Sequence, residues 1–411
     1  MSTLVTQERS LDIKAIRSEF PMLQRRVNGN LIVYLENAGS SLKPSVMINR
    51  LQDFYRNEFA NTNEQNSLSR AATSAVEEVR SAVAEMLGAS SPEEIIFVRN
   101  ATEAINLVAY GFGRSILKPG DEVLVTEMEH DSNVVPWQIA CELSGASLQI
   151  APVESSGVLD LDAFEKKISS RTKMIAVTHV SNVFGTIYPV DKIGSMARQR
   201  GIPFLVDGAQ AAPHMPIDVK DIGCQFYAMS AHKMGGPTGV GVLYGSRDWL
   251  ERLPPYQVGG IMTKSVTPTT HDWKPLPKKF EAGTESIAEI VAFGSAMKYW
   301  QQVGLENITK VERELVQYAT ERLRELDGIR IVGSGSGRVS VLSFTVDGME
   351  PQAVETALDR DGIIVRGGQL NARLLMRRLE LPGVVRASFM FYNTERDCDV
   401  LFESLRQIIR V

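Results

Sequence analysis

Short apolar runs alternate with amphipathic helical patterns between residues 90 and 245, and this alternation constrains the fold most. The runs are almost continuously apolar, which is typical of strands covered by helices on both faces. They lie at 94–98, 122–126, 173–180, 203–207, 225–230 and 239–245. After the first run, Ile105, Val108, Ala109 and Phe112 recur at the spacing of one helix face. The pattern predicts an α/β fold with a mainly parallel central sheet.

Residues 254–285 interrupt this pattern, because the stretch is rich in proline, glycine and threonine and has neither helical nor strand periodicity. Loops of this length inside compact proteins are usually functional or interfacial. A long amphipathic helix then precedes two strands and further helix. The sequence therefore predicts a large domain and a smaller C-terminal α+β domain, with an N-terminal segment that packs on the small domain. The predicted bounds are 1–30 for the segment, 31–295 for the large domain and 296–411 for the small one.

Composition excludes several classes of function. The chain has 411 residues and a net charge of -5, which argues against an electrostatic grip on nucleic acid or on an anionic membrane. Its three cysteines, Cys141, Cys224 and Cys398, are too far apart for a metal-binding or redox pair. The N-terminus has no signal-peptide pattern, and no apolar run approaches the length of a membrane span. We expect a cytoplasmic protein with no metal, nucleic-acid or membrane partner.

Small polar residues follow the first two strands. Ala101 and Thr102 open the helix after 94–98, where free N–H groups and a hydroxyl can hold a phosphate, although an ordinary helix cap uses the same residues. His130 follows 122–126 and either stacks on an aromatic ligand or caps the next helix.

Polar side chains also follow the next two strands. Asn182 comes after 173–180, and Asp207 ends 203–207 with Gln210 close behind. A carboxylate at the end of an apolar strand needs a partner, since an unpaired buried charge is costly. That partner is either a structural arginine or lysine, or the protonated nitrogen of a ligand.

The strand at 225–230 ends in Ser230, followed by Ala231, His232, Lys233 and two glycines. A desolvated lysine loses its proton more easily and becomes a nucleophile suited to Schiff-base chemistry. Ligands of open α/β sheets gather outside the carboxyl ends of the strands. The order of phosphate site, ring-stacking residue, acid and lysine on successive strand ends favours a pyridoxal 5′-phosphate site.

The same segments carry a family resemblance that spans nearly the whole chain from about residue 30. The matching motifs are YLENAGSSLKPS, RNATEAINLVA, DEVLVTEMEHDSNVVPWQ, THVSNVFGTIYPV, VDGAQAAPH, SAHKMGGPTGVGVLYG, FEAGTES and VRASFMFYNT. They resemble the class V aminotransferase family of fold-type I pyridoxal phosphate enzymes, nearest to its cysteine desulfurase and selenocysteine lyase branch. The resemblance implies a homodimer that acts on a small amino acid.

The resemblance also implies a role for each matching residue. Lys233 would form the Schiff base, Asp207 would pair with the ring nitrogen, and His130 would stack on the ring. Asn182 and Gln210 would bond the ring oxygen. The implied phosphate ligands are Ala101, Thr102, Ser230, His232 and, from the neighbouring subunit, Thr284.

The substrate side of the site departs from the family pattern. Arg386 is implied to bind the substrate carboxylate; the alternative is a surface or interdomain salt bridge. Cysteine desulfurases of this branch have a segment resembling R-x-G-H-H-C-A-x-P-L-M, and here Asn371 occupies the cysteine position. Gln369 and Leu370 replace the two histidines. An amide cannot attack sulfur or carry a persulfide. We expect Asn371 and Asn182 to contact the substrate.

The leading prediction is a pyridoxal phosphate lyase that performs α,β-elimination on a cysteine-derived or similar β-substituted amino acid, giving pyruvate and ammonia. A second hypothesis keeps the cofactor but proposes transamination, epimerisation or oxidative deamination. A true cysteine desulfurase and a non-catalytic homologue are the remaining alternatives.

Overall fold

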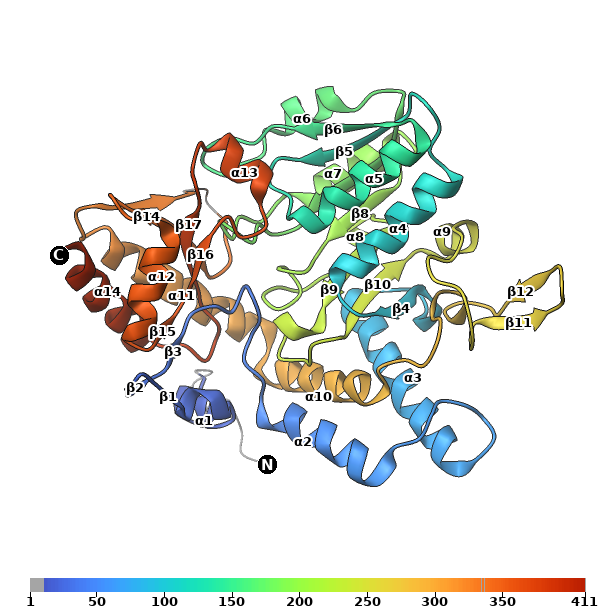
Figure 1. Ribbon diagram of the computed structural model, residues 1–411, viewed down its shortest axis with the longest axis horizontal. Coiled ribbons are helices and arrows are strands. Elements are labelled where there is room, and N and C mark those ends of the chain that lie inside the picture. The colour runs from blue at the N-terminus through green and yellow to red at the C-terminus, as the bar shows by residue number, and fades with distance from the viewer. Residues whose placement is uncertain (1–10, 334, 336, 411) are drawn as a thin grey trace.

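The central element of the computed structural model, which describes residues 11–333, 335 and 337–410, is a seven-stranded sheet (Figure 1). Its strands are β4 (Ile95–Val98), β5 (Glu122–Thr126), β6 (Ser147–Ala151), β7 (Thr172–Thr178), β8 (Phe204–Asp207), β9 (Phe226–Ser230) and β10 (Gly241–Gly245). The order is β4-β10-β9-β8-β7-β5-β6, and only β10 runs antiparallel to its neighbours. The predicted α/β fold with a mainly parallel sheet is confirmed. Of the seven strands of this sheet, only the edge strand β6 was not predicted, and its residues are mostly half-exposed.

Helices bury both faces of this sheet, as the continuously apolar strands require. Within β8, Leu205 packs into the core under α4 and α5, whereas Phe204 and Val206 pack into the core shared with α3, α7 and α10. The helices of this part are α3 (Ser67–Leu87), α4 (Ala101–Ser115), α5 (Val135–Ser144), α6 (Leu161–Lys167), α7 (Val190–Gln199), α8 (Val219–Ile222), α9 (Arg247–Arg252) and α10 (Ile287–Val303). The short 3-10 turns are η3 (Pro92–Glu94), η4 (Asp131–Asn133) and η5 (Ala231–Lys233).

A second, antiparallel sheet follows α10 and α11 (Leu305–Leu323). Its order is β13-β14-β17-β16, from Ile329–Val332, Val341–Val346, Val384–Ser388 and Arg366–Gly368. The helices of this part are α12 (Pro351–Arg360), α13 (Arg373–Arg378) and α14 (Glu395–Ile409). Helices α12 and α14 share a separate apolar cluster with the sheet, whereas α13 packs into the main core. The predicted boundary at 295/296 falls inside α10, and the division into domains stays a prediction.

The N-terminal segment contacts helices α12 and α14 of the C-terminal part. Residues 1–10 of the predicted 1–30 segment lie outside the described residues. Arg17 in α1 (Ile13–Ser18) forms an ion pair with Asp397 of α14 at 3.0 Å. The following elements are η1 (Pro21–Gln24), β1 (Arg26–Val27), β2 (Asn30–Leu31), β3 (Val33–Tyr34), α2 (Ser45–Asp53) and the π-helix η2 (Phe54–Glu58). Strand β3 pairs in parallel with β15 (Ile363–Ile364), so it is joined to the C-terminal part.

The irregular 254–285 segment contains a hairpin of β11 (Thr263–Val266) and β12 (His271–Trp273), followed by the turn η6 (Lys278–Phe280). Figure 1 shows the hairpin projecting from the body of the molecule. In the described part of the chain, no helix has both the length and the apolar character needed to cross a membrane.

Candidate active site

A cavity of about 850 Å³ opens at the carboxyl ends of the central strands, and β16, β17 and the loop before α13 close its other side. The predicted site residues that line it are Ala101, Thr102, His130, Asn182, Asp207, Gln210, Ser230, His232, Lys233, Asn371 and Arg386. Thr284 is the one predicted residue that does not. Strand ends therefore bring these side chains together from positions nearly 300 residues apart.

Lys233 lies in η5, directly after β9, and its amine faces the cavity. Burial lowers its pKa to about 8, against the opposing effect of the Asp207 carboxylate, and the Arg386 guanidinium lowers the pKa further. A usable fraction of the amine is therefore neutral near pH 7, which is the form that attacks a carbonyl carbon.

Asp207 ends β8 and is only 6% exposed. The Ala209 N–H donates a hydrogen bond to Oδ1 at 3.0 Å. Within the described residues, no lysine, arginine or histidine nitrogen lies within 4.0 Å of its carboxylate. The sequence allowed either a structural arginine or lysine or a ligand nitrogen as the partner of Asp207. The described residues provide no such cation within 4.0 Å, and Asp207 lines a cavity that can receive a cationic ligand atom.

The structure shows the capping role of His130, and the stacking role stays a prediction. Its Nδ1 accepts a hydrogen bond from the Ser132 N–H at 3.1 Å and so caps η4, while the ring lines the cavity. Burial lowers the pKa of His130, and Lys233 contributes to the same effect. A ring kept neutral in this way is suited to stacking on a flat ligand.

The start of α4 forms the floor of the phosphate region that the sequence predicts. Asn100 caps the helix by accepting the Glu103 N–H at 2.9 Å. The Ala101 N–H donates to Ser230 Oγ at 2.8 Å, which joins this helix start to the end of β9. Thr102 Oγ1 lies 2.8 Å from Ser132 Oγ. Hydroxyls and amides thus converge where the helix dipole favours an anion.

Arg386, in β17, is a buried cation whose charge is not balanced. The side chain is 4% exposed, its Nη1 donates to the Asn182 carbonyl at 2.9 Å, and its Nε is buried without a hydrogen-bond partner. Burial lowers its pKa to about 10, and Glu36 opposes this shift. Among the described residues Arg386 forms no salt bridge, so its guanidinium remains available for a carboxylate in the cavity.

Gln210 supplies a second unsatisfied polar atom. Its Nε2 donates to the Ala38 carbonyl at 2.7 Å, and its Oε1 is buried without a partner. A buried unpaired acceptor costs free energy unless a ligand completes it. Together with the unpaired Asp207 carboxylate, the amine of Lys233 and the anion-binding start of α4, this atom fits pyridoxal phosphate, which offers a ring nitrogen, an aldehyde, a ring hydroxyl and a phosphate.

Asn371 lies on a strained loop at the mouth of the cavity. Leu370 and Asn371 have φ angles of 56° and 52°, in the left-handed region. The Asp131 N–H donates to the Asn371 carbonyl at 2.7 Å, and Asn182 Nδ2 donates to the Leu370 carbonyl at 2.9 Å. Arg373 pairs with Asp131 next to them. The loop is thus tied to the segment that carries His130.

None of the three cysteines takes the place of a thiol at this loop. Cys141, Cys224 and Cys398 are all buried, and none lines the cavity. Burial raises the pKa of Cys141 to about 11 and raises those of the other two well above the usual range. Buried thiols of this kind are poor nucleophiles.

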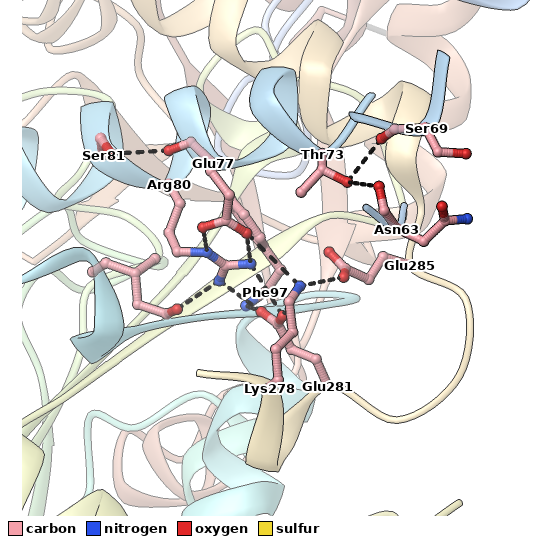
Figure 2. Close-up of polar contacts among 11 residues, drawn as sticks. Asn63, Ser69, Thr73, Glu77, Arg80, Ser81, Phe97, Lys278, Glu281 and Glu285 are labelled. Carbon is pink, nitrogen blue, oxygen red and sulfur yellow. Dashed lines mark hydrogen bonds and ion pairs between the residues drawn. The ribbon is translucent and has the colours of Figure 1, made fainter. Parts of the chain in front are cut away.

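Thr284 lies on a separate cavity of about 220 Å³, and a charge cluster fixes the segment that carries it. Figure 2 shows Lys278 between Glu281 and Glu285, with Arg80 of α3 beside them. The fully buried Arg80 binds both oxygens of Glu281, at 2.7 and 3.0 Å, and Lys278 binds Glu281 at 2.8 Å and Glu285 at 2.6 Å. The predicted role of Thr284 in a neighbouring subunit stays a prediction.

Several residues without a predicted role also line the cavity: Tyr34, Glu36, Ser40, Gln352 and Arg366. The first three lie in a motif that was used only for the family resemblance. Arg366 Nη1 lies 3.8 Å from Glu36 Oε1, a contact between residues 330 positions apart that no local pattern could reveal.

Known proteins resemble this chain along nearly its whole length. The sequence profile of the class-V aminotransferases matches residues 33–401. A probable cysteine desulfurase of Halalkalibacterium halodurans is 44% identical over 95% of this chain and 97% of its own length. One of Mycolicibacterium paratuberculosis is 45% identical over 97% of this chain but only 58% of its own length, so the chain spans little more than half of that relative. A cysteine desulfurase of Thermococcus onnurineus, solved in its apo form, superposes with a TM-score of 0.92 at 34% identity, covering 97% of this chain and 98% of the solved one.

Proposed function

The chain belongs to the class-V aminotransferase family, and on this basis we propose that it is a pyridoxal phosphate enzyme of the cysteine desulfurase-like class that acts as an α,β-eliminating C–S lyase. Its substrate would be a cysteine-derived or similar amino acid with a leaving group on Cβ. The observation that carries the proposal is a cavity in which Lys233, Asp207 and Arg386 converge but which no cysteine of the chain lines.

Bound pyridoxal phosphate supplies an aldehyde that condenses with amines and a ring that accepts the electrons of a Cα–H bond. Asp207 can keep the ring nitrogen protonated, because its buried carboxylate has no other cation nearby among the described residues. Arg386 can hold the substrate carboxylate through the guanidinium N–H groups that are not bonded to the Asn182 carbonyl. These two anchors fix which Cα bond stands perpendicular to the ring.

Lys233 is then the base that takes the Cα proton, since its depressed pKa leaves a neutral amine near physiological pH. The Cβ–S bond breaks, and the electron pair leaves with sulfur. The remaining three-carbon fragment takes up water and releases ammonia. For cysteine the balance is cysteine plus water giving pyruvate, ammonia and hydrogen sulfide.

Asn371 supports elimination over sulfur transfer. Transfer needs a protein nucleophile that attacks sulfur, whereas in elimination sulfur leaves with its own electrons. The amide of Asn371 can donate and accept hydrogen bonds at the cavity mouth, but it cannot carry a sulfur atom.

We also propose that the enzyme works as a homodimer in which Thr284 of one subunit completes the phosphate site of the other. The support is that Thr284 lies between Glu281 and Glu285, which Lys278 binds, but outside its own subunit's cavity. Sedimentation of the purified protein tests this assembly.

The test of the reaction is product analysis with cysteine and with other β-substituted amino acids. Pyruvate and ammonia in equal amounts, with no alanine, support the proposal. Alanine formed in step with sulfide, together with a protein persulfide detected by mass spectrometry, would show a true desulfurase. Retention of the β-substituent in the product would show transamination or epimerisation.

A further inference from the structure

The backbone carbonyl that directly precedes Lys233 is surrounded by donors from residues 40–43, which are called segment 40–43 below. The His232 oxygen lies 2.7 Å from Lys43 Nζ, 3.1 Å from the Ser41 N–H, and 3.2 Å from the hydroxyls of both Ser40 and Ser41. A carbonyl has two lone pairs, so this one is offered more donors than it needs. Segment 40–43 comes from nearly 190 residues away and meets η5 at the residue before Lys233.

Segment 40–43 also binds the turn on the other side of Lys233, at Gly235. The Gly235 N–H donates to Ser41 Oγ at 2.8 Å, and Ser41 is 2% exposed. The residues on either side of Lys233 are therefore both held by segment 40–43. The turn that carries the lysine cannot shift without breaking these bonds.

Lys43 is the charged member of this segment, and this half-buried lysine lacks the usual carboxylate partner among the described residues. Its ammonium also donates to the Ser41 carbonyl at 2.7 Å and lies 3.4 Å from Ser40 Oγ. No carboxylate of the described residues lies within 4.0 Å of Nζ. A cation that is partly removed from water and bound only to neutral oxygens loses hydration without gaining an ion pair, so its position calls for a function.

We propose that Lys43 is a positioning residue of the active site: its ammonium holds the His232 carbonyl and so fixes the turn that presents His232 and Lys233 to the cavity. This inference rests on the proposed cofactor but not on the proposed elimination, because it concerns how the lysine and the phosphate site are presented.

The charge of Lys43 has a second effect on this turn. Burial lowers the pKa of His232 to about 4, with further lowering from Lys233 and Lys43. The other charged or titratable groups around the same cavity are Asp207, His130, Arg386, Arg366, Arg373, Glu36 and Tyr34. Burial alone lowers the pKa of Lys43 itself to about 7, so its charge is present below that pH and fades above it.

Lys279 provides a matched control for a lysine that only caps carbonyls. Its Nζ donates to the carbonyls of Leu250 and Glu251, at 2.8 and 2.9 Å, it is half-buried, and burial lowers its pKa as well. It does not line the cavity. Lys279→Met therefore removes an equivalent structural contact without touching η5.

The first measurement is cofactor binding by the apoenzyme, followed as the visible absorbance that develops on adding pyridoxal phosphate. We expect Lys43→Met to weaken binding about tenfold or more and to slow the appearance of the band, because the turn is no longer fixed. Lys43→Gln keeps a donor without the charge and should bind more tightly than Lys43→Met. Lys279→Met should bind as the wild type does. Equal binding by Lys43→Met and wild type, or an equal loss in Lys279→Met, would overturn the proposal.

The second measurement needs neither cofactor nor turnover. The chain has only five histidines, so His232 can be assigned in a histidine-labelled NMR spectrum through His232→Gln. Both Lys43→Met and Lys43→Gln should raise the pKa of His232, by up to about one unit, while Lys279→Met leaves it unchanged. An unchanged His232 titration in both Lys43 variants would contradict the charge effect. Because neither measurement depends on products, this inference can fail while the proposed elimination stands, and the reverse.

Discussion

Replacing Arg386 by methionine should separate stability from activity. The substitution keeps most of the side-chain volume but removes a buried cation that has one hydrogen bond, to the Asn182 carbonyl at 2.9 Å, and an unpartnered Nε. If Arg386 binds a substrate carboxylate, its buried charge destabilises the enzyme without substrate, and the carboxylate compensates for this loss of free energy on binding.

The size of this cost follows from the pKa. Burial lowers the pKa of Arg386 to about 10, which corresponds to about 3 kcal/mol of unfavourable free energy for the charged form at neutral pH. The hydrogen bond to Asn182 offsets about 1.5 kcal/mol of it. The charged form of Arg386 is less favourable in the folded protein than in the unfolded chain, so its burial lowers the unfolding free energy. This penalty is fully present below about pH 10, where the side chain is charged in both states. Arg386→Met should therefore raise the unfolding free energy of the apoenzyme by about 1–2 kcal/mol.

The same change should remove most of the activity. Loss of one partner of a buried charge pair costs about 2–5 kcal/mol, so kcat/KM should fall about a hundredfold or more, largely through KM. Urea denaturation of the apoenzyme and steady-state kinetics measure the two effects, and the cofactor band should be retained. A destabilised apoenzyme with normal KM would mean that Arg386 is a structural residue, and loss of the cofactor band would refute the carboxylate role.

Three further outcomes are expected. Asn371→Cys places a thiol at the cavity mouth but should not convert the product from pyruvate to alanine, because Gln369 and Leu370 also differ from the desulfurase pattern. Alanine detected by chromatography would show that residue 371 alone decides the reaction. Glu281→Gln removes the charged bidentate partner of the fully buried Arg80 and should lower the unfolding free energy by about 3–5 kcal/mol. The side chain of Glu77 is 40% exposed, so Glu77→Gln should lower it by less than about 1 kcal/mol. Equal losses for the two variants in urea denaturation would contradict this expectation. The rate at which the apoenzyme captures pyridoxal phosphate should rise with pH and reach half of its plateau near pH 8, because only the neutral amine of Lys233 attacks and its pKa is lowered to about 8. A half-plateau above about pH 10 would show an ordinary, exposed lysine.

The strand ends were the most predictable part of the site. Asp207 and Lys233 each follow an apolar run, and parallel strands deliver such residues to one edge whatever the details of packing. The edge strand β6 was missed because its half-exposed residues lack a continuous apolar pattern.

Contacts between distant segments could not be predicted in this way. The Asn182 carbonyl that holds Arg386, the pairing of Glu36 with Arg366, and the meeting of Lys43 with His232 depend on how the N-terminal segment and the second sheet close over the first. Such contacts arise from tertiary packing, and no local spacing in the sequence encodes them.

The central claim is that the amine of Lys233 holds the cofactor opposite the carboxylate of Asp207. Reduction of the cofactor-loaded protein with borohydride, followed by peptide mapping, tests it most directly, because reduction makes the link to the lysine permanent. We expect a pyridoxyl group on the peptide that contains Lys233, both in the wild type and in Asp207→Asn, and an altered visible band in the variant. A pyridoxyl group on another lysine, or none at all, would contradict it.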